Sequence, residues 1–153
     1  SSDDKEEAHK NLVKKFDLAR FCRLLGAFYH YGISLPTAFD ILSVSLSNYR
    51  YKQAVVTIKE NVARGVALSD ALDLEDKSLF PRIMVRVLRG AERTAGVDES
   101  LWRLADFYEG ELENSLRNLT TIIEPVMIVI LGAAVVGIAV AVILPIYKVT
   151  TSF

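Results

Sequence analysis

The feature that most constrains this chain is an apolar run close to its C-terminus. From Val126 to Ile146 the sequence reads VMIVILGAAVVGIAVAVILPI, without a charged or amide side chain. At ~1.5 Å per residue a helix of this length rises about 30 Å, the thickness of the hydrocarbon core of a bilayer. Core helices of small domains rarely stay apolar on every face for so long. The run therefore predicts a single transmembrane helix over residues 125–147.

The residues before this run are enough for one domain with a modest hydrophobic core, which we place at residues 16–124. Residues 1–15 are polar and charged and are expected to form a leader or linker, and residues 148–153 a short tail. The formal net charge of −1 argues against a nucleic-acid-binding protein, because such proteins carry a basic excess. Cys22 is the only cysteine, which excludes an intrachain disulfide and a zinc site built from cysteines.

Apolar residues recur at three- and four-residue spacing along the domain, which predicts an all-α fold. Gly32 and Gly65 are expected to end helices, because the residue that terminates a helix often adopts positive φ. Ser34 and Asp98 are expected N-caps, since their side-chain oxygens can accept a hydrogen bond from a free backbone N–H. The helix that starts at Asp98 runs toward the membrane segment, where Pro125 should kink or interrupt it.

Four arginines share one face of the helix that is expected after Phe80-Pro81. They are Arg82, Arg86, Arg89 and Arg93, and we call them the arginine row. The row predicts a docking site for an acidic partner or for anionic lipid headgroups, at about 1 kcal/mol per basic residue near a membrane. The alternative is a solvated face whose arginines pair with acids of neighbouring helices. The candidate acids are Asp70, Asp73, Glu75 and Asp76.

Small residues recur at every fourth position of the apolar run, at Ala133, Gly137 and Ala141. Such a face lets a second helix approach closely in lipid, so it predicts helix–helix packing; the alternative is ordinary lipid-facing composition. Glu124 lies at the mouth of the run beside Pro125, where an acid is costly to bury. Its carboxylate is expected to accept backbone N–H groups, to meet a basic residue of a partner, or to face headgroup water.

Residue patterns typical of catalytic and metal sites are missing from the sequence. His9 and His30 are its two histidines, and neither forms a His-Glu pair at helical spacing. There is no glycine-rich loop with a lysine to cradle phosphates, so the chain is not itself an ATPase. Glu109, Glu111 and Glu113 spread over different helix faces, although a weak cation site at an oligomer interface stays open. We expect a non-catalytic protein without a cofactor or a metal.

Several short motifs also follow one another in a defined order. They are YGISLPTAF at 31–39, GVALSDAL at 65–72, Phe80-Pro81, Asp106-Phe107-Tyr108 with Glu111, Leu119 to Pro125, and Leu144-Pro145-Ile146. In this order and spacing they resemble the secretion protein F family, the inner-membrane platform proteins of bacterial type II secretion and type IV pilus systems. The similarity extends over most of the chain.

One segment departs from the pattern of that family. The family usually has Gly-Glu-x-Ser/Thr-Gly-x-Leu-Asp where this chain has AERTAGVD at residues 91–98. Glu92, Thr94 and Asp98 match, so Glu92 is assigned to a structural turn like those at Gly32 and Gly65. Alanine replaces both glycines, and a differently shaped turn is therefore expected.

The resemblance implies an antiparallel bundle of about six helices on the cytoplasmic side of the inner membrane, followed by one transmembrane helix continuous with, or kinked from, the last bundle helix. It also implies contact with a cytoplasmic assembly ATPase, with pilin or pseudopilin subunits, with other inner-membrane components and lipid, and with further copies of the chain. Family members commonly carry two such domains and three membrane helices. With one domain and one span, this chain resembles their C-terminal part and is expected to be a fragment.

Two questions stay open at this level. Charge does not fix the orientation, because Arg117 before the span and Lys148 after it balance one another. Pilus and secretion systems are not distinguished either. A membrane-tethered regulatory adaptor is the main rival function, followed by a membrane enzyme whose active residues are divided between copies of the chain.

Overall fold

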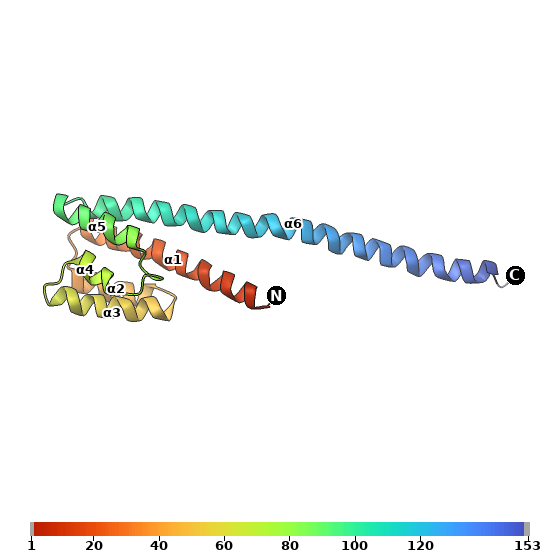
Figure 1. The fold of residues 1–153 in the computed structure, drawn as a ribbon, viewed down its shortest axis with the longest axis horizontal. Coiled ribbons are helices and arrows are strands. Elements are labelled where there is room, and N and C mark those ends of the chain that lie inside the picture. Colours follow the sequence, from red (N-terminus) through yellow and green to blue (C-terminus); the bar gives the residue numbers. More distant parts are fainter. Residues whose placement is uncertain (1, 152–153) are drawn as a thin grey trace. The chain divides into compact units, whose positions relative to one another are not determined.

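The computed structural model describes residues 2–151, and within that range it contains six α-helices and no strand (Figure 1). The helices are α1 (Ser2–His30), α2 (Leu35–Ser45), α3 (Tyr49–Ala63), α4 (Leu68–Asp73), α5 (Arg82–Thr94) and α6 (Val97–Thr151). The predictions of an all-α fold and of six helices are confirmed. The chain divides into a first unit, Ser1–Glu113, and a second unit, Asn114–Phe153, so that α6 contributes residues to both.

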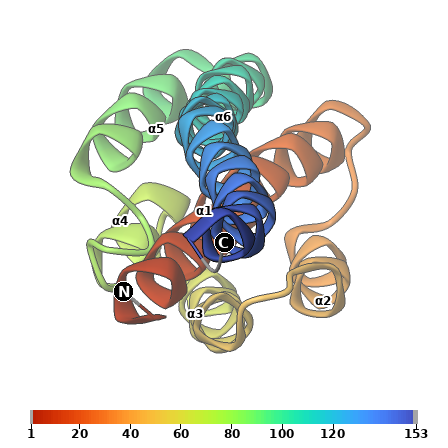
Figure 2. The same ribbon diagram turned by 90° about the vertical axis from the view of Figure 1, so that its right-hand side faces the viewer.

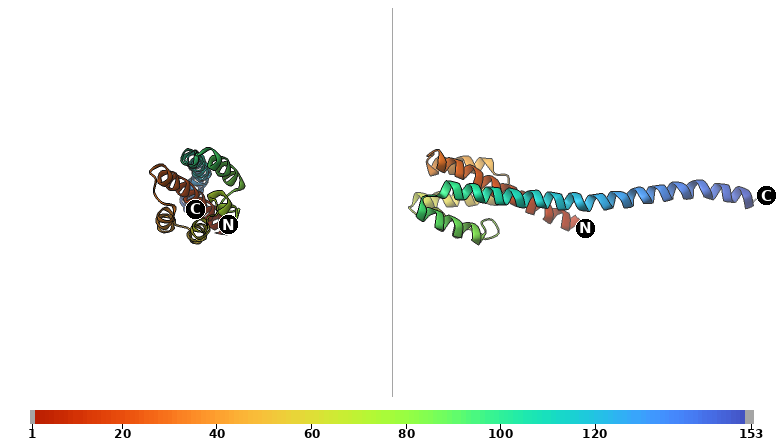
Figure 3. Two further views of the ribbon diagram at one scale, coloured as in Figure 1. Left: turned by 90° about the vertical axis from the view of Figure 1, so that its left-hand side faces the viewer. Right: turned by 90° about the horizontal axis from the view of Figure 1, so that it is seen from above.

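The hydrophobic core lies in the first unit. Consecutive helices from α1 to α5 pack against one another, and α2 to α5 follow each other around α1 (Figures 2 and 3). Helix α1 buries Phe21, Cys22 and Leu25 completely. The Phe21 ring packs edge-on against Phe80, with 5.1 Å between ring centroids. Burial also raises the pKa of the Cys22 thiol, because a thiolate would lose its hydration there.

The polar segment that was expected to form a leader is helical from Ser2 onward, as the start of α1. Asp3 and Asp4 lie in the first turn, where negative charge is favourable beside free backbone N–H groups. Glu6 and Lys10 form an ion pair of 2.8 Å one turn further on. Local charge placement thus accounts for a helix in a segment that buries almost no side chain. That residues 1–15 act as a linker stays a prediction.

Helices α1 and α6 meet at a glycine and at an ion-pair cluster. A Cβ atom added to Gly26 would lie 2.7 Å from Cδ1 of Trp102, so only glycine allows this approach of the two helices. Arg23 Nη2 donates to Asp106 at 2.5 Å and to Glu109 at 2.9 Å. Both carboxylates raise the pKa of Arg23, with Glu109 the larger cause. Glu109 is therefore part of the α1–α6 contact.

Gly32 and Gly65 end their helices as predicted. Gly32 has φ of +69°, and the next N–H, of Ile33, bonds the carbonyl of Phe28 at 2.9 Å. Gly65 has φ of +93°, and the Val66 N–H bonds the carbonyl of Asn61 at 3.1 Å. Each bond returns to a carbonyl that the end of the helix would leave free.

Alanine takes the same conformation at the end of α5. Ala95 has φ of +56°, and the Gly96 N–H bonds the carbonyl of Ala91 at 3.1 Å. The expectation of a differently shaped turn is therefore wrong: the backbone bonding favours the left-handed conformation despite the Cβ atom. An L residue in that conformation costs roughly 1–2 kcal/mol.

Both expected side-chain N-caps are corrected. Ser34 does precede α2, but its hydroxyl donates to the Thr37 hydroxyl at 2.9 Å and caps no backbone N–H. Asp98 lies inside the first turn of α6, where its carboxylate meets Nδ1 of His30 at 3.0 Å and the Glu99 N–H at 2.9 Å. These contacts, His30 first, lower the pKa of Asp98. Pro125 does not interrupt α6.

Replacing Ala95 by glycine should stabilise the first unit. The substitution relieves the left-handed strain but gives the unfolded chain more freedom, so we expect a net gain of about 0.5–1 kcal/mol in the free energy of unfolding. Urea denaturation followed by circular dichroism measures this value. The reciprocal change Gly32→Ala should lower it by about 1 kcal/mol. A loss of stability in Ala95→Gly would show that the turn is not strained.

Candidate functional site

The arginine row lies on α5 and divides into paired and unpaired members. Arg89 Nη2 lies 3.0 Å from an oxygen of Asp70 and 3.5 Å from one of Asp73. In the part of the chain that the structure describes, Arg82, Arg86 and Arg93 form no ion pair. Pairing with neighbouring acids is thus confirmed for Arg89. Of the other candidate acids, Asp76 pairs with Arg50 on α3 instead.

Arg82, Arg86 and Arg89 also line a surface hollow of about 380 Å³, which we call the arginine hollow. Lys77, Asp73 and Val85 complete its lining. Asp73 is the only acid there, and it lies 2.7 Å from Nζ of Lys77. That contact is the largest cause of the lowered pKa of Asp73. One carboxylate faces four cations, so the hollow is electropositive and suited to an anionic group. Arg93 does not line it.

Glu92 holds two helices together. Its carboxylate accepts the backbone N–H of Ser69 at 2.9 Å and the Ser69 hydroxyl at 2.6 Å. Ser69 lies in the first turn of α4, where backbone N–H groups lack partners within the helix and a negative charge is favourable. The assignment of Glu92 to a turn is therefore incomplete, because it fixes the start of α4 against α5.

Asp17 makes the corresponding contact between α1 and the start of α3, and the sequence analysis missed it. The residue is fully buried, and its carboxylate accepts the N–H groups of Ser47 at 3.0 Å and Asn48 at 2.5 Å. Asn48 is the N-cap of α3 and accepts the Arg50 N–H at 2.9 Å. The available signal was an acid directly before Leu18, within the apolar stripe of α1.

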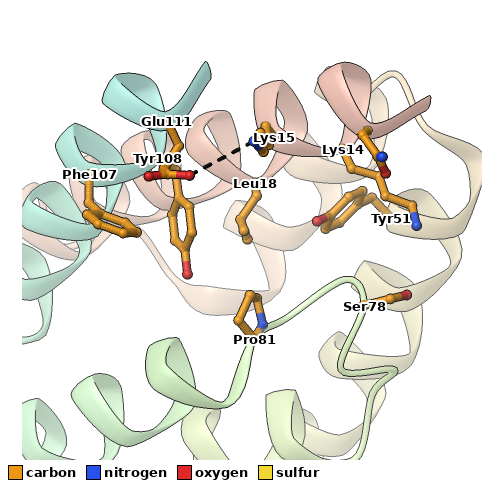
Figure 4. A pocket seen from close by; sticks show the side chains of 10 residues that line it. Lys14, Lys15, Leu18, Tyr51, Ser78, Pro81, Phe107, Tyr108 and Glu111 are labelled. Carbon is orange, nitrogen blue, oxygen red and sulfur yellow. Dashed lines mark ion pairs between the residues drawn. The ribbon is translucent and has the colours of Figure 1, made fainter. Parts of the chain in front are cut away.

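A second pocket, which we call the Tyr108 pocket, opens between α1, α6 and the segment before α5 (Figure 4). Its volume is about 380 Å³, and its lining is Asn11, Lys14, Lys15, Leu18, Tyr51, Ser78, Pro81, Phe107, Tyr108 and Glu111. The Tyr51 hydroxyl donates to the carbonyl of Leu79 at 2.6 Å. The Tyr108 hydroxyl is buried and has no hydrogen-bond partner within the described residues. Desolvation raises the pKa of Tyr108 to about 12.

The second unit contains the residues that were predicted to lie in the membrane. The apolar part of α6, which lies in this unit, reaches a mean hydropathy of 3.1 and is long enough to cross a membrane. Ala133, Gly137 and Ala141 are exposed, and nothing lies within 4 Å of a Cβ atom added to Gly137. Glu124 and Pro125 are exposed as well. An exposed apolar surface of this extent is typical of a region that contacts lipid or other protein.

These elements define a class of protein: an all-α domain whose last helix contains a segment long and apolar enough to span a membrane. Comparison with known proteins makes the assignment specific. Residues 21–145 match the family model described as Type II secretion system (T2SS), protein F. The chain belongs to this family, and the resemblance found in its motifs is confirmed.

Similar relatives come from both kinds of machine. The chain is 34% identical over 137 residues to the type IV pilus assembly protein PilC of Pseudomonas aeruginosa. It is 32% identical over 139 residues to the PilC of Thermus thermophilus. It is 30% identical over 135 residues to the type II secretion system protein F of Pseudomonas aeruginosa. These alignments cover 90%, 91% and 88% of this chain but 36%, 34% and 33% of the relatives, so the chain spans about a third of their length.

Removing the Asp17 carboxylate should destabilise the first unit strongly. Asp17→Ala leaves two backbone N–H groups without an acceptor, and we expect the free energy of unfolding to fall by about 2–4 kcal/mol. Asp17→Asn keeps one acceptor oxygen and should cost about half as much. Urea denaturation gives both values. The matched control Glu7→Gln, at an exposed position of α1, should change stability by less than about 0.5 kcal/mol. Equal effects at both positions would show that the buried contact contributes little.

Proposed function

We propose that this chain is part of a non-catalytic inner-membrane platform of a type IV pilus or type II secretion machine. In that platform it couples a cytoplasmic assembly ATPase to the assembly of pilin-like subunits or to protein secretion. The match of residues 21–145 to the family carries the proposal. The apolar segment of α6 supports a place in the membrane, and the names of the relatives support both kinds of machine.

We assign different tasks to the two units. The first unit, on the cytoplasmic side, presents surfaces to soluble partners, and the second unit packs among membrane helices of the platform. Because α6 contributes residues to both units, partner binding on one can affect packing in the other through a single helix. Retention of the assembly ATPase by the chain in lipid nanodiscs tests this function. A regulatory adaptor outside the filament machine would not retain it.

The arginine row is our proposed contact for the ATPase. Arg82 and Arg86 form no ion pair within the described residues, and the hollow that they line has one carboxylate against four cations. An acidic surface would find guanidinium groups there that need not first leave an intramolecular partner. The electrostatic gain from such a contact falls as the salt concentration rises.

Reversing two of these charges should weaken capture of the ATPase. For Arg82→Glu with Arg86→Glu we expect at least about tenfold weaker retention, because attraction becomes repulsion at two positions. The charge-matched control reverses Lys52 on α3 and Arg64, the residue directly after α3, both outside the hollow. Binding is measured by pull-down at several salt concentrations, and helicity by circular dichroism. Equal loss in both double variants would point to net charge rather than to the row.

The face of Ala133, Gly137 and Ala141 is our proposed contact with another membrane helix, either of a second copy or of the rest of the platform. Gly137→Leu should abolish close packing, because the added side chain separates two helices that touch at their backbones. Cysteine crosslinking within the span should fall several-fold. The control Val135→Leu changes volume off this face and should preserve crosslinking. A pattern indifferent to Gly137→Leu would place this face against lipid.

A further inference from the structure

The Tyr108 hydroxyl poses a physical problem that the platform function does not explain. The side chain is 6% exposed, and its hydroxyl is the one buried side-chain polar atom in residues 2–151 that lacks a hydrogen-bond partner. Buried polar atoms almost always have partners, because leaving one unpaired costs stability. Phenylalanine would fill the same space without this cost. Tyr108 lines the pocket, so this hydroxyl is a hydrogen-bond donor that a ligand seated there would satisfy.

The pocket around this hydroxyl offers an apolar floor. Leu18 and Pro81 line it together with Tyr108, and in Figure 4 the Tyr108 side chain extends from α6 in the direction of Pro81. The Tyr51 hydroxyl is already bound to the Leu79 carbonyl, so Tyr51 contributes mainly its ring. Phe107 is 55% exposed and continues the apolar surface at the rim. At about 380 Å³ the pocket has room for one aromatic or branched side chain with its backbone.

The charged residues of the pocket give a net positive rim. Lys14 and Lys15 stand against a single acid, Glu111. The ion pair between Lys15 Nζ and Glu111 is long, at 3.9 Å. Lys14 forms no ion pair within the described residues, since the other pairs of this part of α1 involve Lys10 and Lys15. A carboxylate on the ligand would complement this lysine.

We propose that the Tyr108 pocket binds an acidic peptide segment of a partner protein. One large apolar side chain of the segment occupies the floor, a peptide oxygen accepts a hydrogen bond from Tyr108, and a neighbouring carboxylate lies at Lys14. A peptide meets all three requirements at once, because it carries carbonyl oxygens beside its side chains. This site is separate from the arginine hollow and goes beyond the proposed function.

A binding measurement with defined peptides tests the proposal. The probe is a fluorescein-labelled, amidated peptide Gly-Glu-Glu-Phe-Glu-Glu-Gly, and the protein is the whole chain in lipid nanodiscs. We expect saturable binding by fluorescence anisotropy. Replacing the glutamates of the probe by lysine, or its phenylalanine by glycine, should weaken binding at least about tenfold. Binding that is indifferent to either change would overturn the proposal, as would the absence of saturable binding.

Tyr108→Phe separates a ligand-binding hydroxyl from a structural one. This variant should bind the probe about two- to tenfold more weakly, which is the loss of affinity expected for one hydrogen bond. Its melting temperature should stay the same or rise. Tyr51→Phe, which removes a satisfied hydrogen bond, should lower the melting temperature. Tyr31→Phe, 76% exposed and outside the pocket, is the control and should change neither quantity.

The contrary outcome is equally clear. If Tyr108→Phe lowers the melting temperature as much as Tyr51→Phe and leaves binding unchanged, the Tyr108 hydroxyl has a structural partner such as a buried water, and the proposal fails. Lys14→Glu should weaken binding of the acidic probe and strengthen binding of the probe in which lysine replaces the glutamates. Unchanged binding of both probes would show that Lys14 is not part of the site. Since no ATPase is present in these measurements, their failure leaves the platform function to be judged by ATPase capture.

Discussion

The buried carboxylate of Asp17 is the contact on which the order of the first unit depends. It comes from the middle of the longest helix of that unit's core and binds two successive backbone N–H groups at the junction of α2 and α3. Hydrophobic packing brings helices together without fixing their register, because apolar contacts have little directionality. Two hydrogen bonds to one carboxylate do fix it. Glu92 makes the equivalent contact at the start of α4, so that both loops are tied to side chains distant in sequence.

This dependence explains how far the sequence could predict the fold. The ends of α1 and α3 follow from local chemistry, because a glycine with positive φ closes the last turn whatever the rest of the chain does. The apolar segment of α6 follows from composition alone. Asp17 and Glu92 could not be assigned in this way, since their partners lie about 30 and 23 positions away and depend on how the helices pack. Helix α1 began earlier than expected because charge placement, rather than an apolar stripe, favours its first turns.

The candidate sites show the same division. Spacing placed the four arginines on one face of α5, as a helical period requires, but only the packed structure separates Arg89, paired with α4, from Arg82 and Arg86. The Tyr108 pocket is built from α1, α3, α6 and the segment before α5, and no sequence window contains more than a few of its residues. At Ala95 the motif suggested a change of shape, yet the hydrogen bonds of the helix end outweigh the penalty of a methyl group.

The depth of Cys22 has a practical consequence for the whole chain. Its thiol is inaccessible, and burial disfavours the thiolate that alkylating reagents attack. Toward such reagents the folded protein therefore behaves as though it had no cysteine. Any reaction at this thiol requires that helices of the first unit separate. The rate of alkylation at Cys22 therefore measures how often this opening occurs. Cys22 thus reports whether a ligand or partner tightens the first unit, without a label having to be introduced.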